Sequence, residues 1–134
     1  MPSPIHYLAI AAGGAMGAVL RYGVGGWVQD TRLAEPGRWF GAALPWGTLV
    51  VNLSGCLLIG LLAGLMQRRL LVHPDLRALV LIGLLGGYTT FSTFALETLR
   101  LVQEGSLGAA LANGLGSPLL GLVGVWLGDM LAGS

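Results

Sequence analysis

Four long apolar runs constrain what this chain can fold into. They cover residues 5–27, 47–66, 76–101 and 107–131 of the 134 residues. A helix rises about 1.5 Å per residue, so about 20 apolar residues cross the ~30 Å hydrocarbon core of a bilayer. Because lipid offers the backbone no hydrogen bonds, runs of this length predict transmembrane helices. We therefore expect an all-α membrane protein with a single four-helix transmembrane domain over residues 1–134.

The first run is expected to stay in the mature protein. No basic segment precedes it and no small-residue cleavage site closes it, so it differs from a secretory signal peptide. With the other three runs, it predicts a multi-pass membrane protein.

The composition excludes several other classes of protein. Only 10% of the residues are charged, against about a quarter in a typical soluble domain. A single cysteine, Cys56, excludes an intramolecular disulfide framework and a cysteine-based zinc site, and we expect it to pack inside the second span. A net charge of +1 provides no basic face for nucleic acid. His6 and His73 lie at span edges without a nucleophile beside them, so we predict that the protein is not an enzyme.

All seven basic residues are arginines, and the two sides of the membrane share them almost evenly. One side, with both termini, carries Arg68, Arg69 and Arg77; the other carries Arg21, Arg32, Arg38 and Arg100. Asymmetry of positive charge sets the orientation of a membrane protein. The near balance leaves two interpretations open. Either one orientation is weakly specified, or the chain inserts both ways and forms an antiparallel dual-topology homodimer.

Pairs of small residues four positions apart recur along the runs. They are Gly13/Gly17, Gly60/Gly64, Gly83/Gly87, Ser117/Gly121 and Gly124/Gly128. Such pairs let helix backbones approach closely in lipid. Some of them must pack within one chain, but for four thin, glycine-rich helices we expect an oligomer.

The third run contains a segment that is unfavourable in a helix. Gly86 and Gly87 are followed by Tyr88 and the β-branched pair Thr89 and Thr90. Gly86 lies about 15 Å along the helix axis from residue 76, near the middle of the bilayer. We expect a broken third helix here, since unwound backbone at that depth lines a cavity or an ion site when it is not buried in protein. The alternative is a kink whose backbone groups are satisfied by threonine hydroxyls.

Aromatic and polar side chains in the spans also allow either a structural or a pore-lining interpretation. Phe91 and Phe94 are three residues apart and share a face, and aromatic rings carry positive charge at their edges, so two ring edges favour an anion. The alternative for them is core packing. Polar pairs four residues apart, Thr48/Asn52 and Asn113/Ser117, predict either interhelical hydrogen bonds or a pore lining.

Three blocks of spaced residues follow one another along the chain. They are Gly13-Gly14-x-x-Gly17-Ala18-x-x-Arg21-Tyr22, then Gly47-Thr48-Leu49-x-x-Asn52-x-x-Gly55-x-x-x-x-Gly60, then Gly86-Gly87-x-Thr89-Thr90-Phe91-Ser92-Thr93-Phe94-x-x-Glu97. In this order they resemble the signature blocks of the CrcB/Fluc fluoride channels over essentially the whole chain. The third block is long and specific, whereas the first alone is weak.

The resemblance implies a fold and a function. The fold is a four-helix subunit with a broken third helix, assembled as an antiparallel dual-topology homodimer with two fluoride pores. The function is passive export of fluoride across the bacterial inner (plasma) membrane, which lowers its concentration inside the cell and confers fluoride resistance. The resemblance also implies a structural, non-transported sodium ion (Na+) at the dimer interface, held by the backbone carbonyls of Gly86 and Thr89.

Further roles follow from the same resemblance, position by position. Asn52, Phe91, Phe94 and Ser117 match pore residues. Arg21, Thr48, Thr90, Thr93, Glu97 and Asn113 are candidates for a vestibule or supporting role. The sequence departs from the family pattern at Asn113 and Gly121, where some members carry hydroxyl side chains, and Pro118 follows Ser117 directly. These departures put the polar track along the fourth span in doubt.

Two other functions compete with the channel. A small proton-coupled drug exporter requires an acidic residue deep in a span, but the first span has none and Glu97 lies beyond the expected break. A structural membrane assembly factor predicts no ion flux and no dependence on sodium.

Overall fold

The computed structural model describes residues 3–31, 44–68 and 72–133. Arg32, Arg38 and Arg69, on which part of the charge balance depends, lie outside the described residues. The described residues are mostly helical and contain no strand.

Within the described ranges, four helical spans are long and apolar enough to cross a membrane. The first, second and fourth are single helices: α1 (Pro4–Asp30), α2 (Trp46–Arg68) and α6 (Leu107–Gly133). The third runs over residues Pro74–Gln103 and consists of α3 (Pro74–Arg77), the π-helical segment η2 (Ala78–Leu85), α4 (Gly86–Tyr88) and α5 (Phe91–Gln103). The prediction of four apolar helices is confirmed, with helix ends within three residues of those expected.

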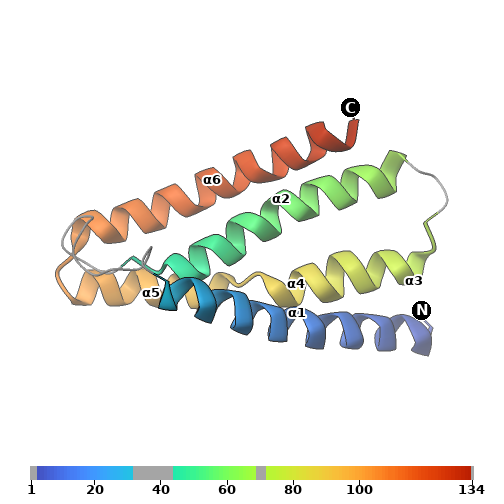
Figure 1. The fold of residues 1–134 in the computed structure, drawn as a ribbon, viewed down its shortest axis with the longest axis horizontal. Helices are drawn as coiled ribbons and strands as arrows, with labels where there is room; N and C mark the ends of the chain where they lie inside the picture. The colour runs from blue at the N-terminus through green and yellow to red at the C-terminus, as the bar shows by residue number, and fades with distance from the viewer. Residues whose placement is uncertain (1–2, 32–43, 69–71, 134) are drawn as a thin grey trace.

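The spans run up and down along one long axis (Figure 1). The two termini lie at the same end of the molecule, and the turn between α5 and α6 lies at the other end. That turn includes Gly105, whose φ of 76° is a left-handed conformation that glycine adopts without strain. Helix α2 packs mainly against α6, and α1 packs mainly against η2 and α4.

Glycines bring α1 into backbone contact with the third span. A Cβ atom on Gly17 would collide with the Leu84 carbonyl oxygen, and one on Gly87 would lie 2.6 Å from the Gly14 carbonyl oxygen. On the other side of the molecule, a Cβ on Gly60 would collide with the Val125 carbonyl oxygen of α6. Several small-residue pairs from the sequence therefore pack within one chain, where van der Waals contact replaces the hydrophobic effect.

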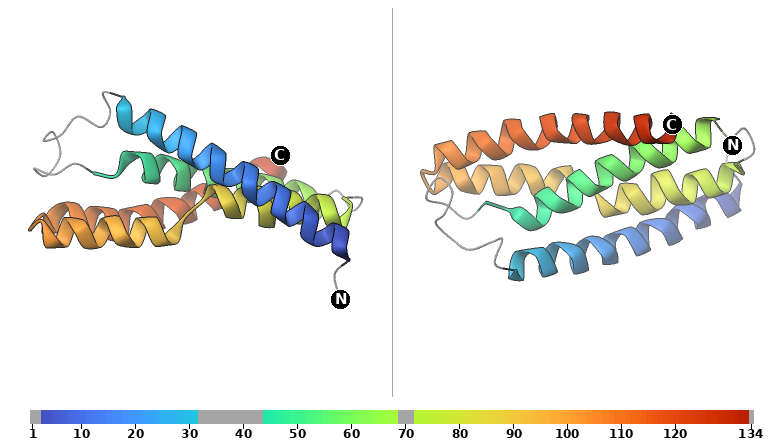
Figure 2. Two further views of the ribbon diagram at one scale, coloured as in Figure 1. Left: turned by 90° about the horizontal axis from the view of Figure 1, so that it is seen from below. Right: turned by 45° about the horizontal axis from the view of Figure 1, so that its top comes forward.

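The third span loses its helical conformation later than the glycines predict. Gly86 and Gly87 are helical, and the missing Cβ of Gly87 leaves room for the close contact with α1. The extended residues are instead Thr89 (φ −82°, ψ 159°) and Thr90 (φ −149°, ψ 119°). Figure 2 shows this segment as the non-helical link between α4 and α5. The expectation that the glycines themselves unwind was wrong.

Large apolar side chains cover the outside of the described bundle. On α6 the residues Leu111, Leu115, Leu119, Leu122 and Trp126 are each at least 60% exposed. An exposed apolar surface of this extent is typical of helices that face lipid or another protein chain.

Candidate functional site

Asn52 of α2 satisfies both backbone groups of Thr90 in the extended segment. Its Nδ2 donates to the Thr90 carbonyl oxygen at 3.0 Å, and its Oδ1 accepts from the Thr90 N–H at 2.8 Å. The orientation of the amide follows from these partners, because a carbonyl only accepts and an N–H only donates. The interhelical hydrogen bond expected of Asn52 is therefore present, and one Nδ2 hydrogen remains for another acceptor.

Two carbonyls lose their usual helical donors at this point. In a continuous helix the N–H of residue i donates to the carbonyl of residue i−4. The Thr90 N–H donates instead to Asn52, so it does not serve the Gly86 carbonyl. The Thr93 N–H donates to Thr90 Oγ1 at 3.2 Å, which caps α5, so it does not serve the Thr89 carbonyl. The Gly86 and Thr89 carbonyls therefore lack these two helical donors.

A cavity of about 540 Å³ adjoins the extended segment. It lies between α2, the end of η2, the start of α5 and α6, and its polar and aromatic lining residues are Asn52, Cys56, Thr89, Thr90, Phe91, Phe94 and Ser117. The structure thus brings together all four side chains that the sequence assigned to a pore. Cys56 also lies close to Gly121, whose missing side chain makes room for the thiol.

The two phenylalanines form a tilted pair at the edge of this cavity. The centroids of the Phe91 and Phe94 rings are 5.8 Å apart and the ring planes make an angle of 44°. Phe91 is 79% exposed in the isolated chain. Core packing within the chain, the alternative for these residues, therefore does not describe Phe91.

A line of hydrogen bonds joins α5 to α6 beside the cavity. Thr98 Oγ1 donates to the Phe94 carbonyl, Asn113 Nδ2 donates to Thr98 Oγ1, and Ser117 Oγ donates to Asn113 Oδ1, at 2.8, 2.8 and 3.0 Å. Asn113 is buried, with 5% of its surface exposed. Pro118 lies inside α6, which remains one helix from end to end.

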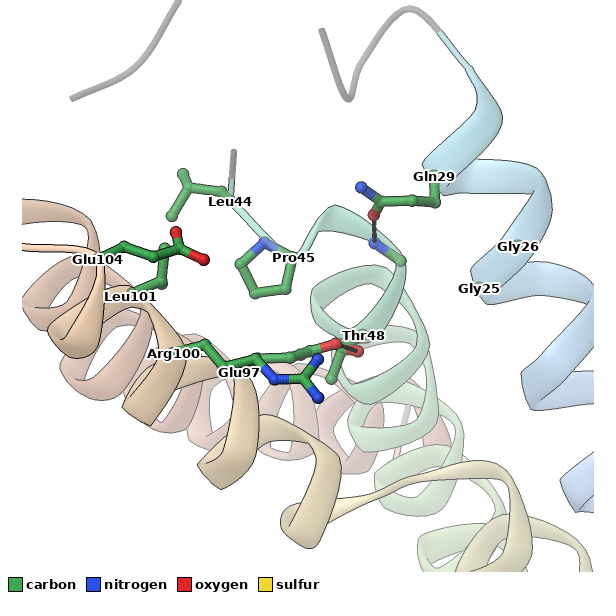
Figure 3. Close-up of a pocket in the computed structure, with 11 residues that line it drawn as sticks. Gly25, Gly26, Gln29, Leu44, Pro45, Thr48, Glu97, Arg100, Leu101 and Glu104 are labelled. Carbon is green, nitrogen blue, oxygen red and sulfur yellow. Dashed lines mark hydrogen bonds between the residues drawn. The ribbon is translucent and has the colours of Figure 1, made fainter. Parts of the chain in front are cut away.

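A second cavity, of about 430 Å³, lies near the end of the bundle where α1 finishes (Figure 3). Thr48 Oγ1 donates to Glu97 Oε1 at 2.8 Å at this cavity, while Glu97 Oε2 is buried without a hydrogen-bond partner among the described residues. Arg100 and Gln29 also line it, and Gln29 Oε1 accepts from the Gly47 N–H at 3.3 Å.

A third cavity, of about 340 Å³, lies between these two. Arg21, Thr48, Thr90 and Thr93 are among its lining residues. Thr48 also lines the cavity at the bundle end. Thr90 also lines the cavity that contains Phe91 and Phe94, called here the phenylalanine cavity. The three cavities are therefore neighbours along the bundle. None of the ion pairs among the described residues includes Arg21.

The chain is similar in sequence to a known protein family. Residues 8–129 match the family described as CrcB-like protein, Camphor Resistance (CrcB). That match covers nearly all of the chain. The protein belongs to the CrcB family.

Several CrcB proteins are similar to it over most of their length. The fluoride-specific ion channel FluC of Solibacter usitatus is 46% identical over 128 residues, which are 96% of this chain and 98% of the relative. Proteins of the same name from Magnetococcus marinus and Thermus thermophilus are 50% and 44% identical, over 89% and 96% of this chain and 90% and 94% of the relatives. The relatives are ion channels by name, in agreement with the prediction that the chain is not an enzyme. With its four apolar helices, this CrcB protein is a multi-pass bacterial membrane protein.

Sequence reasoning missed two polar residues of this region. Thr98 lies four residues after Phe94 and so shares its helix face, but its contact with Asn113 joins helices that only the fold brings together. Gln29 lies at the end of the first apolar run, where a polar residue is normal, and its hydrogen bond to Gly47 left no signal in the sequence.

Proposed function

We propose that this CrcB protein is a fluoride channel that lets fluoride leave the cell passively. Its relatives are named fluoride-specific ion channels. The observation that carries the proposal is the shared cavity of Asn52, Phe91, Phe94 and Ser117 beside the extended segment.

The chemistry of this cavity suits a small anion. Fluoride is strongly hydrated, so a pore must replace its water with other donors and must still release the ion. Phenylalanine ring edges offer partial positive charge without a fixed cation, and Asn52 retains one N–H for an acceptor. Fluoride enters cells as neutral HF, which dissociates inside. A negative-inside potential then favours the exit of the anion by about 2.3 kcal/mol per 100 mV.

A structural sodium ion is the second part of the proposal. Carbonyl oxygens of interrupted helices are ligands for sodium in membrane proteins. The Gly86 and Thr89 carbonyls suit this role, because the N–H groups that normally bond to them donate elsewhere. Sodium prefers oxygen ligands, and backbone carbonyls provide oxygen donors without a cluster of charged side chains. The ion would hold the two halves of the third span in place and would not be transported.

The third part is an antiparallel dual-topology homodimer. Phe91 is largely exposed in one chain, although its ring belongs to the phenylalanine cavity. A second copy would cover this ring and complete the sodium coordination that two carbonyls begin. Insertion of the chain in both orientations would provide the antiparallel partner.

Fluoride efflux from proteoliposomes tests the channel. A fluoride electrode follows the loss of fluoride, and a chloride electrode follows a matched sample. We expect fast fluoride loss with little chloride loss. Folded protein that passes neither ion would contradict the channel and support the rival function as a structural assembly factor.

Sodium and dimerisation need their own measurements. Replacing sodium with a large organic cation during purification is expected to lower the thermal midpoint and the fluoride flux, and the return of sodium is expected to restore both. Single-molecule counting of labelled protein in lipid tests the dimer. If every particle bleached in a single step, each would hold one subunit, which would contradict the dimer.

A further inference from the structure

The line of hydrogen bonds from α5 to α6 has only one possible direction. The Phe94 carbonyl can only accept, so the Thr98 hydroxyl must donate its single proton to it. With that proton used, Thr98 Oγ1 can only accept from Asn113, which must present its Nδ2. The Asn113 amide therefore turns its Oδ1 towards Ser117, and Ser117 must donate.

This direction determines what Ser117 can offer to an ion. Ser117 lines the cavity that also contains Asn52, Phe91 and Phe94. A serine hydroxyl has one proton, and here that proton points to Asn113 at an O···O distance of 3.0 Å. The oxygen therefore presents only lone pairs to the cavity, which disfavour an anion. Because Asn113 is buried and bonded on both sides, its amide cannot turn without breaking these bonds.

We propose that Asn113 is a positioning residue that withholds the Ser117 proton from the anion, and that Thr98 sets the direction of the Asn113 amide. The inference rests on the proposed fluoride function. Ser117 can donate to fluoride only if it breaks its hydrogen bond to Asn113. The free energy lost with that bond offsets much of the free energy gained from the bond to fluoride. Asn113 thereby keeps fluoride binding in the cavity weak, which a conducting pore requires for release.

The quantity that tests this role is the fluoride concentration at half-maximal efflux. Thr98→Val removes the hydroxyl that fixes the Asn113 amide at nearly constant volume. The amide can then turn its Nδ2 to Ser117, and the Ser117 proton becomes available to fluoride. A hydrogen bond to an ion strengthens binding by about tenfold or more, so the half-saturating concentration should fall by about tenfold. Maximal efflux should fall as well, because release slows.

Two further variants make the test specific. Thr98→Ser keeps the hydroxyl and should retain the wild-type half-saturating concentration. Asn113→Leu removes the acceptor of the Ser117 proton directly and should act in the same direction as Thr98→Val. Adding Ser117→Ala to Thr98→Val should abolish the gain in affinity, because no hydroxyl proton remains.

The outcomes separate this inference from the proposed function. Wild-type protein without fluoride efflux contradicts the function itself. Wild-type efflux with an unchanged half-saturating concentration in both Thr98→Val and Asn113→Leu overturns the role of Asn113. A gain that persists when Ser117 is replaced also overturns it, since a packing effect would not depend on the serine.

Discussion

Two contacts of the third span follow opposite principles. Where α1 crosses η2 and α4, backbone meets backbone, and glycines such as Gly17 leave no space for a Cβ. Where α2 meets the extended segment, the Asn52 side chain completes the hydrogen bonds of Thr90. Both contacts hold helices together in lipid, where the hydrophobic effect is absent. The first contact depends on the small volume of its residues, and the second depends on its hydrogen bonds. A substitution that changes only volume or only hydrogen bonding should therefore weaken only one of them.

The largest effect is expected at the contact limited by volume. In Gly17→Ala the new Cβ would collide with the Leu84 carbonyl and lie 2.7 Å from the Tyr88 N, and backbone atoms cannot move aside as a side chain does. We expect a loss of about 3 kcal/mol in the free energy of unfolding, at the upper end of the usual cost of overpacking. Thermal unfolding in detergent measures this loss. Gly23→Ala on the same helix is the control, because nothing lies within 4 Å of its new Cβ.

The contact limited by hydrogen bonds should respond next. Asn52→Leu leaves the Thr90 N–H and carbonyl without their partners, at a cost of about 1–3 kcal/mol for each buried group. We expect both lower stability and little fluoride efflux. Leu58→Val, at an exposed position of the same helix, should change neither quantity. Wild-type stability in Asn52→Leu would show that the extended segment does not depend on this amide.

Replacing Phe91 should lower conduction without lowering stability. Its ring is largely exposed in the single chain, so Phe91→Leu is expected to leave the chain folded. Loss of the ring edge should reduce fluoride efflux by about threefold to tenfold, as expected for an aromatic interaction of about 0.5–1.5 kcal/mol. Leu99→Ala, at another exposed position of α5, serves as the control. Unchanged efflux in Phe91→Leu would remove this ring from the pore.

The smallest effect is expected away from both contacts. Arg68 donates to the Asp129 carbonyl at 2.9 Å, and its guanidinium lies 3.4 Å from the Asp129 carboxylate, where both side chains are about half exposed. Exposed ion pairs contribute about 0–1 kcal/mol, so Arg68→Gln should shift the thermal midpoint slightly and leave efflux unchanged. A large loss of efflux would mean that this end of the bundle takes part in conduction.

The sequence predicted the spans well because hydropathy alone determines them. It placed the interruption of the third span too early, since glycine is a poor helix former in general and Gly86 and Gly87 stood out on that basis. The fold uses the missing Cβ of Gly87 for contact with Gly14 and keeps the segment helical. No local property of Gly87 reveals that contact.

The polar residues of the site were predicted more completely than their partners. Asn52 and Asn113 stood out because buried amides are costly in lipid without a partner. Their partners, the Thr90 backbone and the Thr98 hydroxyl, belong to other spans, and single-chain patterns carry no information on which spans meet. For Asn52 the hydrogen bond is present and the residue also lines the cavity, while its role in a pore stays a prediction.

The dependence of Thr90 on Asn52 has a consequence for the biogenesis of the protein. Asn52 precedes Thr90 by 38 residues, so the ribosome delivers the amide before the backbone groups that need it. The second span is therefore already in the membrane when the third one enters, and its Asn52 side chain is available to bond to the Thr90 backbone. A circular permutant in which synthesis starts after Asn52 reverses this order, and the nascent third span would then meet lipid with two unsatisfied backbone groups.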